Sequence, residues 1–351
     1  MAQLNISRRT LLLGGGTAAA ALTGGLFAAR FSGAGWITDP GAEPDSPLVG
    51  AFDTRTDQQL LAPTSLMNTT VPQSFAFDDA RGDVYAVQLV QGGLRLRGED
   101  RQLPSDQRAA EGDMCVTRLP APGTGDPQFM YLRGFGHGVS IGVQPHRSGV
   151  WIWTESDADP ANGYGRAVAR VPFREGTTLD SADPSVVHHR VSPGSQANQP
   201  VLDMAGGRVM VSYWPADDPS RQYYSVYRTE DFVAGRYTEL YKVRQVGRKD
   251  SETFQGCALY GDVVYQLAGN SYTAKSGDNP RSRGGNTRLT AIDLTTGRPA
   301  GRATLTAGRE LPYREPEGLS VRLTDPPRLC VGFGTGEAGG RMLAIHSFGH
   351  R

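Results

Sequence analysis

The chain has 351 residues, with 36 basic and 36 acidic side chains and therefore no net charge at pH 7. A neutral chain lacks the general electrostatic attraction that nucleic-acid binding requires, so we expect no nucleic-acid partner. The 45 Gly and 23 Pro follow no collagen-like period and indicate many turns. Cys115, Cys257 and Cys330 are too scattered for a disulfide framework and lack zinc-ligand spacing. We expect buried free thiols, no metal ion and no cofactor.

The first residues follow the pattern of an export signal. Ser7–Leu13 reads Ser-Arg-Arg-Thr-Leu-Leu-Leu, a twin-arginine signature, and an uncharged stretch follows over residues 11–29. A membrane anchor is the alternative, but five glycines within residues 11–29 make a poor membrane helix. We predict a twin-arginine signal over residues 1–35 and a linker over residues 36–47. The protein is then secreted or associated with the cell wall, with no stable membrane insertion after cleavage.

A pattern of about sixty residues recurs five times in the rest of the chain. Each copy has a polar residue, a small residue, a short apolar strand, a turn and a second apolar strand. The polar positions, which we call the anchor residues, are 64, 62, 56 and 62 residues apart. The first strands are Gln73–Phe77, His137–Ile141, Gln199–Leu202, Gln255–Leu259 and Glu317–Val321. Five matches in near-even register predict a repeat architecture.

The repeat predicts an all-β fold, a five-bladed β-propeller of four-stranded antiparallel blades over residues 48–351. The stretches between the hairpins supply two more strands per repeat, for example Met114–Val116 and Met130–Leu132 in the first. The fifth repeat reaches only its third strand, Met342–Ile345. Residues between Val49 and Leu66 can supply the missing fourth strand, and this N-terminal strand would close the ring without a free edge.

Four short segments resemble those of the teichoic acid biosynthesis protein C-like propellers. They are Gln73–Asp78, Gly134–Gly138, Phe254–Gly256 and Glu315–Leu319. The family also takes its name from receptor-binding proteins of short-tailed staphylococcal phages, and the resemblance extends over roughly residues 48–349. It implies a five-bladed propeller associated with cell-wall glycopolymers, without a well-defined catalytic set.

The candidate site follows from propeller geometry. The first strand of each blade lines the central channel, so the anchor residues Gln73, His137, Gln199, Gln255 and Glu317 should form a ring at one end of it. The small residue after each anchor leaves room for a ligand or another backbone. The long polar loop Asn270–Asn286 should rise at the same end, and its Arg283 is a further candidate ligand contact. We leave Glu315 out of the ring because Pro316 should interrupt a regular strand there.

Three functions remain open. The first is a secreted, glycan-directed binding protein for anionic wall polymers such as teichoic acids, working as a monomer. The second is a glycoside hydrolase or polysaccharide lyase in which His137 and Glu317 are the catalytic acid and base. The third is a scaffold propeller that binds an envelope protein. The partner is a cell-wall polysaccharide or teichoic acid in the first two cases.

Overall fold

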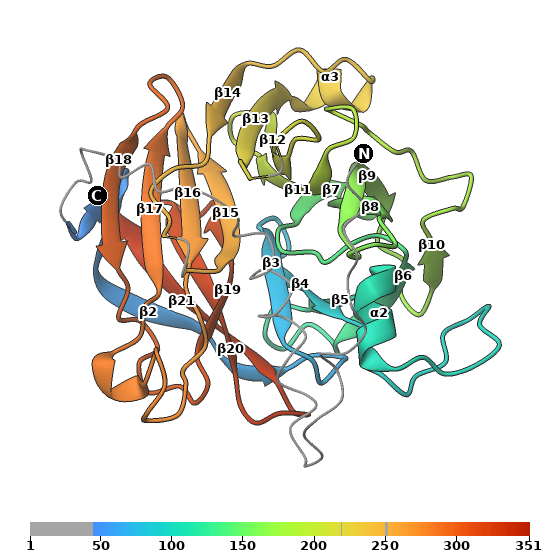
Figure 1. The fold of residues 1–351 in the computed structure, drawn as a ribbon, viewed down its shortest axis with the longest axis horizontal. Helices are drawn as coiled ribbons and strands as arrows, with labels where there is room; N and C mark the ends of the chain where they lie inside the picture. The colour runs from blue at the N-terminus through green and yellow to red at the C-terminus, as the bar shows by residue number, and fades with distance from the viewer. Residues whose placement is uncertain (1–44, 219, 250–251) are drawn as a thin grey trace, which may run out of the picture.

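The computed structural model describes residues 45–351 except 219, 250 and 251. The predicted signal over residues 1–35 and linker residues 36–44 lie outside the described residues. Within the described part of the chain, no helix is long and apolar enough to cross a membrane. The strands form five sheets arranged as a ring, which we number as blades I to V along the chain (Figure 1).

Blades I, III and IV are antiparallel meanders of four consecutive strands. Blade I consists of β3 (Pro72–Asp78), β4 (Asp83–Leu89), β5 (Met114–Leu119) and β6 (Gln128–Arg133). Blade III consists of β11 (Gln196–Asp203), β12 (Arg208–Trp214), β13 (Tyr223–Arg228) and β14 (Tyr241–Arg244). Blade IV consists of β15 (Phe254–Tyr260), β16 (Val263–Ala268), β17 (Arg288–Asp293) and β18 (Pro299–Thr304). The first strand of each blade contacts the first strands of both neighbouring blades, so the innermost strands form a closed ring.

Blade II has three paired strands, β7 (Gly142–His146), β8 (Gly149–Ala158) and β9 (Gly165–Pro172). The next segment leaves the blade, because β10 (Thr178–Asp180) pairs in parallel with β6 of blade I. Among the described residues, the fourth strand of blade II is reduced to a single antiparallel bridge between Val168 and His189. Pro184 and Pro193 flank this bridge, and proline has no N–H to donate to a ladder.

Blade V joins the two ends of the described chain. Its strands are β19 (Glu315–Arg322), β20 (Arg328–Thr335), β21 (Met342–His350), β2 (Phe52–Ser65) and β1 (Leu48–Val49). Strand β2 runs antiparallel to β21 from the pair Phe52–His350 to the pair Ser65–Met342. Figure 1 shows blue β2 beside red β21. The predicted closure by an N-terminal strand is therefore confirmed.

Helices occur only as short pieces of loops in the described chain. They are α2 (Ser105–Glu111), α3 (Thr229–Val233) and the 3₁₀ turn η3 (Arg281–Arg283). Helix α2 orients Arg108, a fully buried guanidinium that bonds the carboxylates of Glu99 and Asp113. This ion pair holds the long β4–β5 loop against blade I.

The core is divided among the interfaces between neighbouring blades. One apolar cluster fills each interface, so each blade is buried on both faces. Between blades I and II, for example, Val87 and Met114 pack with Ile141 and Ile152. A strand buried on both faces needs no polar side chain between its apolar ones. This explains why the sequences of the strands are continuous apolar runs. Burial of each large apolar side chain contributes about 1.5–3 kcal/mol to the free energy of unfolding.

Candidate functional site

The anchor residues lie where the innermost strands begin. In blades I, III, IV and V, the pairing of the first strand with the second slips at this point. The slips fall between Pro72 and Ser74, Gln196 and Gln199, Phe254 and Gly256, and Pro316 and Leu319. Such a bulge sets two residues of one strand against one of its partner and leaves backbone groups unpaired. Four of the anchors are therefore placed at bulges.

The predicted strand over His137–Ile141 is wrong, because β7 begins only at Gly142. Gly138 has a φ of 68°, in the left-handed region that interrupts a strand. The backbone N–H of His137 donates to Oε2 of Glu155 at 3.0 Å instead of to a neighbouring strand. The anchor of blade II thus precedes its strand.

The small residues after the anchors let backbones meet at the axis. Ser74 Oγ donates to the carbonyl of Gly138 at 2.5 Å, which joins blades I and II. A Cβ on Gly318 would lie 2.8 Å from Cα of Ser74, and one on Gly256 would lie 3.1 Å from the carbonyl oxygen of Val139. Blades II and IV thus touch across the centre. The space predicted for a ligand or a backbone is taken by backbone.

All five anchor side chains are buried, with exposed fractions of 6% for Gln73, 3% for His137, 1% for Gln199, 6% for Gln255 and 3% for Glu317. They do not form one cluster. Gln255 and Glu317 both interact with Glu315, whereas His137 and Gln199 both interact with Glu155. Gln73 stands apart, with Nε2 donating to the carbonyls of Val71 and Pro72. We call this side of the ring the anchor end.

Glu315 and Glu317 form a buried carboxyl pair within β19, so leaving Glu315 out of the candidate site because of Pro316 was wrong. Burial raises the pKa of Glu317 well above its usual range, and the adjacent Glu315 carboxyl raises it further. Burial also raises the pKa of Glu315, although Tyr313, Arg341 and Gln255 oppose this effect. Tyr313 donates its hydroxyl to Oε2 of Glu315 at 2.5 Å. Two adjacent acids with raised pKa values can share one proton.

The backbone just before this pair is strained. Tyr313 and Arg314 have φ values of 68° and 43°, and each left-handed non-glycine residue costs about 1–3 kcal/mol. Arg314 is fully buried and donates to Ala307 O, Leu305 O and Thr287 Oγ1 at 2.8–3.0 Å. The guanidinium of Arg341 lies 3.3 Å from the ring centre of Tyr313. These contacts hold the strained turn in place.

Glu155 is the centre of the second cluster and was missed by the sequence analysis. Its Oε2 accepts the backbone N–H groups of His137 and Gly165 at 3.0 and 2.9 Å. Burial raises the pKa of Glu155 to about 7 and lowers the pKa of His137 to about 4. The His137 ring stacks on Tyr164 with 4.2 Å between ring centres. The one available signal was a glutamate inside the otherwise buried strand β8.

Arg283 lies on the surface at the anchor end. It ends η3 within the loop over residues 270–286, which we call the basic loop, and it is exposed. Arg281 of the same loop donates to the carbonyl of Glu310 at 2.6 Å, and the half-buried Tyr272 donates to the carbonyl of Arg309 at 3.3 Å. These two bonds hold the loop against the segment that precedes β19.

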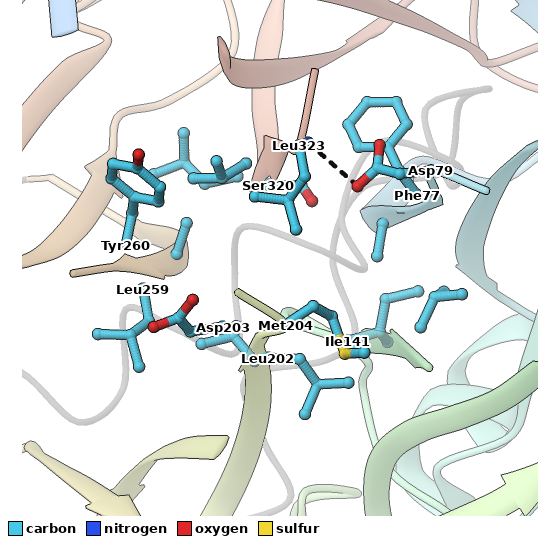
Figure 2. A pocket seen from close by; sticks show the side chains of 17 residues that line it. Phe77, Asp79, Ile141, Leu202, Asp203, Met204, Leu259, Tyr260, Ser320 and Leu323 are labelled. Atoms are coloured by element: carbon cyan, nitrogen blue, oxygen red, sulfur yellow. Dashed lines mark hydrogen bonds between the residues drawn. The ribbon is translucent and has the colours of Figure 1, made fainter. Parts of the chain in front are cut away.

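The opposite side, which we call the hairpin end, has a cavity lined largely by apolar residue types together with Asp79 and Asp203 (Figure 2). A cavity of about 40 Å³ lies between the innermost strands of all five blades, with Ile141, Leu202 and Leu259 among its walls. Its polar groups include Asp79, which accepts the backbone N–H of Leu323 at 3.1 Å. This volume accommodates water but not a sugar ring.

Among the described residues, neither the cysteines nor any cluster of metal-ligating residue types forms a further site. Cys115, Cys257 and Cys330 are free and buried, as predicted, and burial raises the pKa of each thiol to about 12. Thiols of this kind are unreactive. In the part of the chain that the structure describes, no group of three or more His, Cys, Asp or Glu is placed to hold a metal ion.

These features define a five-bladed β-propeller with a closed axis, buried polar groups at one end and a cavity lined largely by apolar residue types at the other. The chain belongs to the family described as the phage 5-bladed beta propeller receptor binding platform domain, whose model matches residues 71–347. The family resemblance found in the sequence is thereby confirmed.

Two relatives are informative. The chain is 24% identical over 304 residues to a Bacillus subtilis (strain 168) protein named major teichoic acid biosynthesis protein C, an alignment covering 85% of this chain and 64% of that protein. The chain thus spans less than two thirds of this curated relative. The tail fiber of Staphylococcus aureus phage P68 aligns with a TM-score of 0.57 and 19% identity, over 83% of this chain and 53% of the fiber chain. At that identity the likeness shows the fold alone.

Proposed function

We propose that this protein works outside the cytoplasm as a binding protein for anionic cell-wall glycopolymers of the teichoic acid type. The observation that carries the proposal is the family match over residues 71–347, a family of receptor-binding platform domains. The name of the Bacillus subtilis relative, a protein of teichoic acid biosynthesis, supports this class of ligand.

The basic loop is the surface that we assign to polymer contact. Arg283 is exposed, and guanidinium groups match the geometry of phosphate oxygens. The buried anchors Gln255 and Glu317 have a supporting role in this assignment, because they hold the start of β15 and β19 beneath the loop. Gln73, Gln199 and His137 support blades I to III in the same way.

Binding is tested by retention of the purified protein on cell walls with and without their teichoic acids. We expect retention on intact walls and loss of retention on stripped walls. Arg283→Gln should weaken retention about three- to tenfold, since one charge-assisted contact is lost. The matched control is Arg298→Gln, an exposed arginine of the same blade in the β17–β18 turn at the hairpin end. Equal retention on both wall preparations would overturn the proposal and favour the protein-binding scaffold.

Export is the second part of the proposal and rests on the twin-arginine pattern of Ser7–Leu13. Twin-arginine export carries folded proteins, and three buried free thiols suit a chain that folds in a reducing compartment. Changing Arg8 and Arg9 together to Lys should block secretion. Normal amounts of the double variant in the culture medium would contradict this prediction.

A glycan-cleaving enzyme is the second candidate, and the Glu315–Glu317 pair is the observation that favours it. Burial and mutual contact raise the pKa values of both carboxyls, which favours the protonated form that an acid catalyst needs. Carboxyls in contact are closer than the about 5–5.5 Å of a retaining glycosidase, and both are buried. Release of soluble sugar from wall polymers should therefore be absent. Release that disappears in Glu317→Gln and in His137→Ala, with retention kept, would establish the enzyme instead.

A further inference from the structure

A second basic feature lies between blades II and III at the anchor end. It is an open depression of about 290 Å³ lined by Asp157, Arg166, Arg190, Gly194 and Ser195. Asp157 comes from β8, Arg166 from the start of β9, and the remaining residues precede β11. A depression of this size is close to the lower end of the range for small-molecule sites.

Asp157 organises the depression. Its φ of 57° is left-handed, a conformation that aspartate tolerates better than most residues. Ser181 Oγ accepts its backbone N–H at 2.9 Å and so fixes the turn. In this position the two oxygens of one carboxylate reach both guanidiniums, Arg166 at 2.8 Å and Arg190 at 2.5 Å.

The two guanidiniums keep unused donors. Arg166 bonds only the carboxylate and the carbonyl of Asp157, and Arg190 bonds only the carboxylate, among the described residues. Each guanidinium has five N–H groups, and the side chains are 43% and 50% exposed. The nearby Asp159 is itself occupied by the backbone N–H of Ala161 and by Gln196 Nε2. One carboxylate thus holds two partly free arginines side by side.

We propose that this depression binds a phosphate group, as a monoester or as a phosphodiester of a polyol-phosphate polymer. Paired guanidiniums present planar sets of donors that suit phosphate oxygens, and pre-positioning by Asp157 removes part of the ordering cost. The inference deepens the proposed function, because it names the charged unit of the polymer that is recognised. It adds a contact in blades II and III to the one assigned to the basic loop in blade IV.

The test uses the purified protein with three probes, namely inorganic phosphate, sn-glycerol 3-phosphate and poly(glycerol phosphate). The double variant Arg166→Gln/Arg190→Gln should bind poly(glycerol phosphate) about tenfold more weakly. The control Arg147→Gln/Arg174→Gln removes two exposed arginines at the hairpin end of blade II and should change binding less than about twofold, because it lowers only the general charge.

The outcomes separate this inference from the proposed function. Equal losses in the two double variants would overturn the phosphate site. If the protein binds no wall polymer but binds inorganic phosphate or sn-glycerol 3-phosphate, and the Arg166/Arg190 variant alone loses this binding, the site stands and the polymer function fails. If no probe binds the unaltered protein, the site is refuted.

Discussion

The anchor end and the hairpin end are made by the same five strands, yet different side chains line the axis at the two ends. At the anchor end, polar groups such as Gln199 and Glu317 are at most 6% exposed and lie beneath loops. At the hairpin end, Leu202 and Leu259 line an open cavity, and Met204 is 42% exposed. The strand pairing explains the difference. The bulges at the anchor end leave backbone groups without ladder partners, whereas the hairpin ends are regularly paired.

The difference between the two ends changes how the five polar anchor residues are interpreted. Five polar residues at equivalent positions looked like a ring around a ligand, but the bulges give them a structural reason that needs no ligand. Each polar cluster is completed by a carboxyl outside the register, Glu155 in one case and Glu315 in the other. The exposed groups suited to binding, Arg283 and the Arg166–Arg190 pair, lie outside the ring on loops and strand ends.

The largest expected difference between the two ends is in the stability lost when a glycine is changed to alanine. In Gly318→Ala, the new Cβ would lie 2.8 Å from Ser74 Cα in a residue with a φ of 87°. We expect the free energy of unfolding to fall by more than about 3 kcal/mol, since backbone must move. Gly207→Ala at the hairpin end shares a positive φ but meets nothing within 4 Å, so only about 1 kcal/mol should be lost. Chemical denaturation measures both, and similar losses would show that the axis is not tightly packed.

The pH dependence of stability should expose the buried acid at the anchor end. The folded-state pKa of Glu155 is raised to about 7, so its stabilising contribution is present below its ordinary pKa near 4.5 and lost as pH rises toward 7. His137, with its pKa lowered to about 4, loses stability as pH falls from its ordinary value near 6.5, so the two effects oppose each other.

Glu155→Gln should separate these two effects. The variant keeps an oxygen for the two backbone N–H groups but cannot ionise. Relative to the unaltered protein, its free energy of unfolding should rise between pH 4.5 and 7 by about 3 kcal/mol. A difference that stays constant over this range would contradict the raised folded-state pKa of Glu155.

The smallest effect on the free energy of unfolding is expected at the hairpin end. Met204→Ser changes a side chain that is 42% exposed at the rim of the apolar cavity. The free energy of unfolding should change by less than about 0.5 kcal/mol, because little apolar area leaves water when this residue folds. A loss above about 1.5 kcal/mol in thermal denaturation would show that the rim is packed, and the contrast between the two ends would narrow.

The repeat in the sequence was sufficient to predict the five blades and the closing strand. Continuous apolar runs such as Val209–Val211 identify strands buried on both faces. The fifth repeat lacks a fourth strand after Met342–Ile345, and the segment before the first repeat was available to supply it. The bulges were not predictable, because a bulge depends on the pairing of two strands rather than on the sequence of one. The same holds for β10, whose partner β6 belongs to the previous blade.

The candidate site was predicted less well because burial of polar groups is not local. His137, Gln199, Gln255 and Glu317 were found by register, but their partners Glu155 and Glu315 do not follow it. Pro316 suggested an interruption that the bulge accommodates within β19. Asp157 was missed, since its left-handed turn has no sequence signal beyond the aspartate itself.

The antiparallel seam between β2 and β21 has a mechanical consequence. Phe52 pairs with His350, so the chain enters and leaves the propeller at one corner of blade V. A force that pulls the two ends apart would first load the contacts of Asp45 and Ser46 with blade IV and would then separate the β2–β21 pairs one after another. A force between one end and a bound polymer would instead be spread over several blade interfaces. A propeller of this design resists load when it is tethered by a single end.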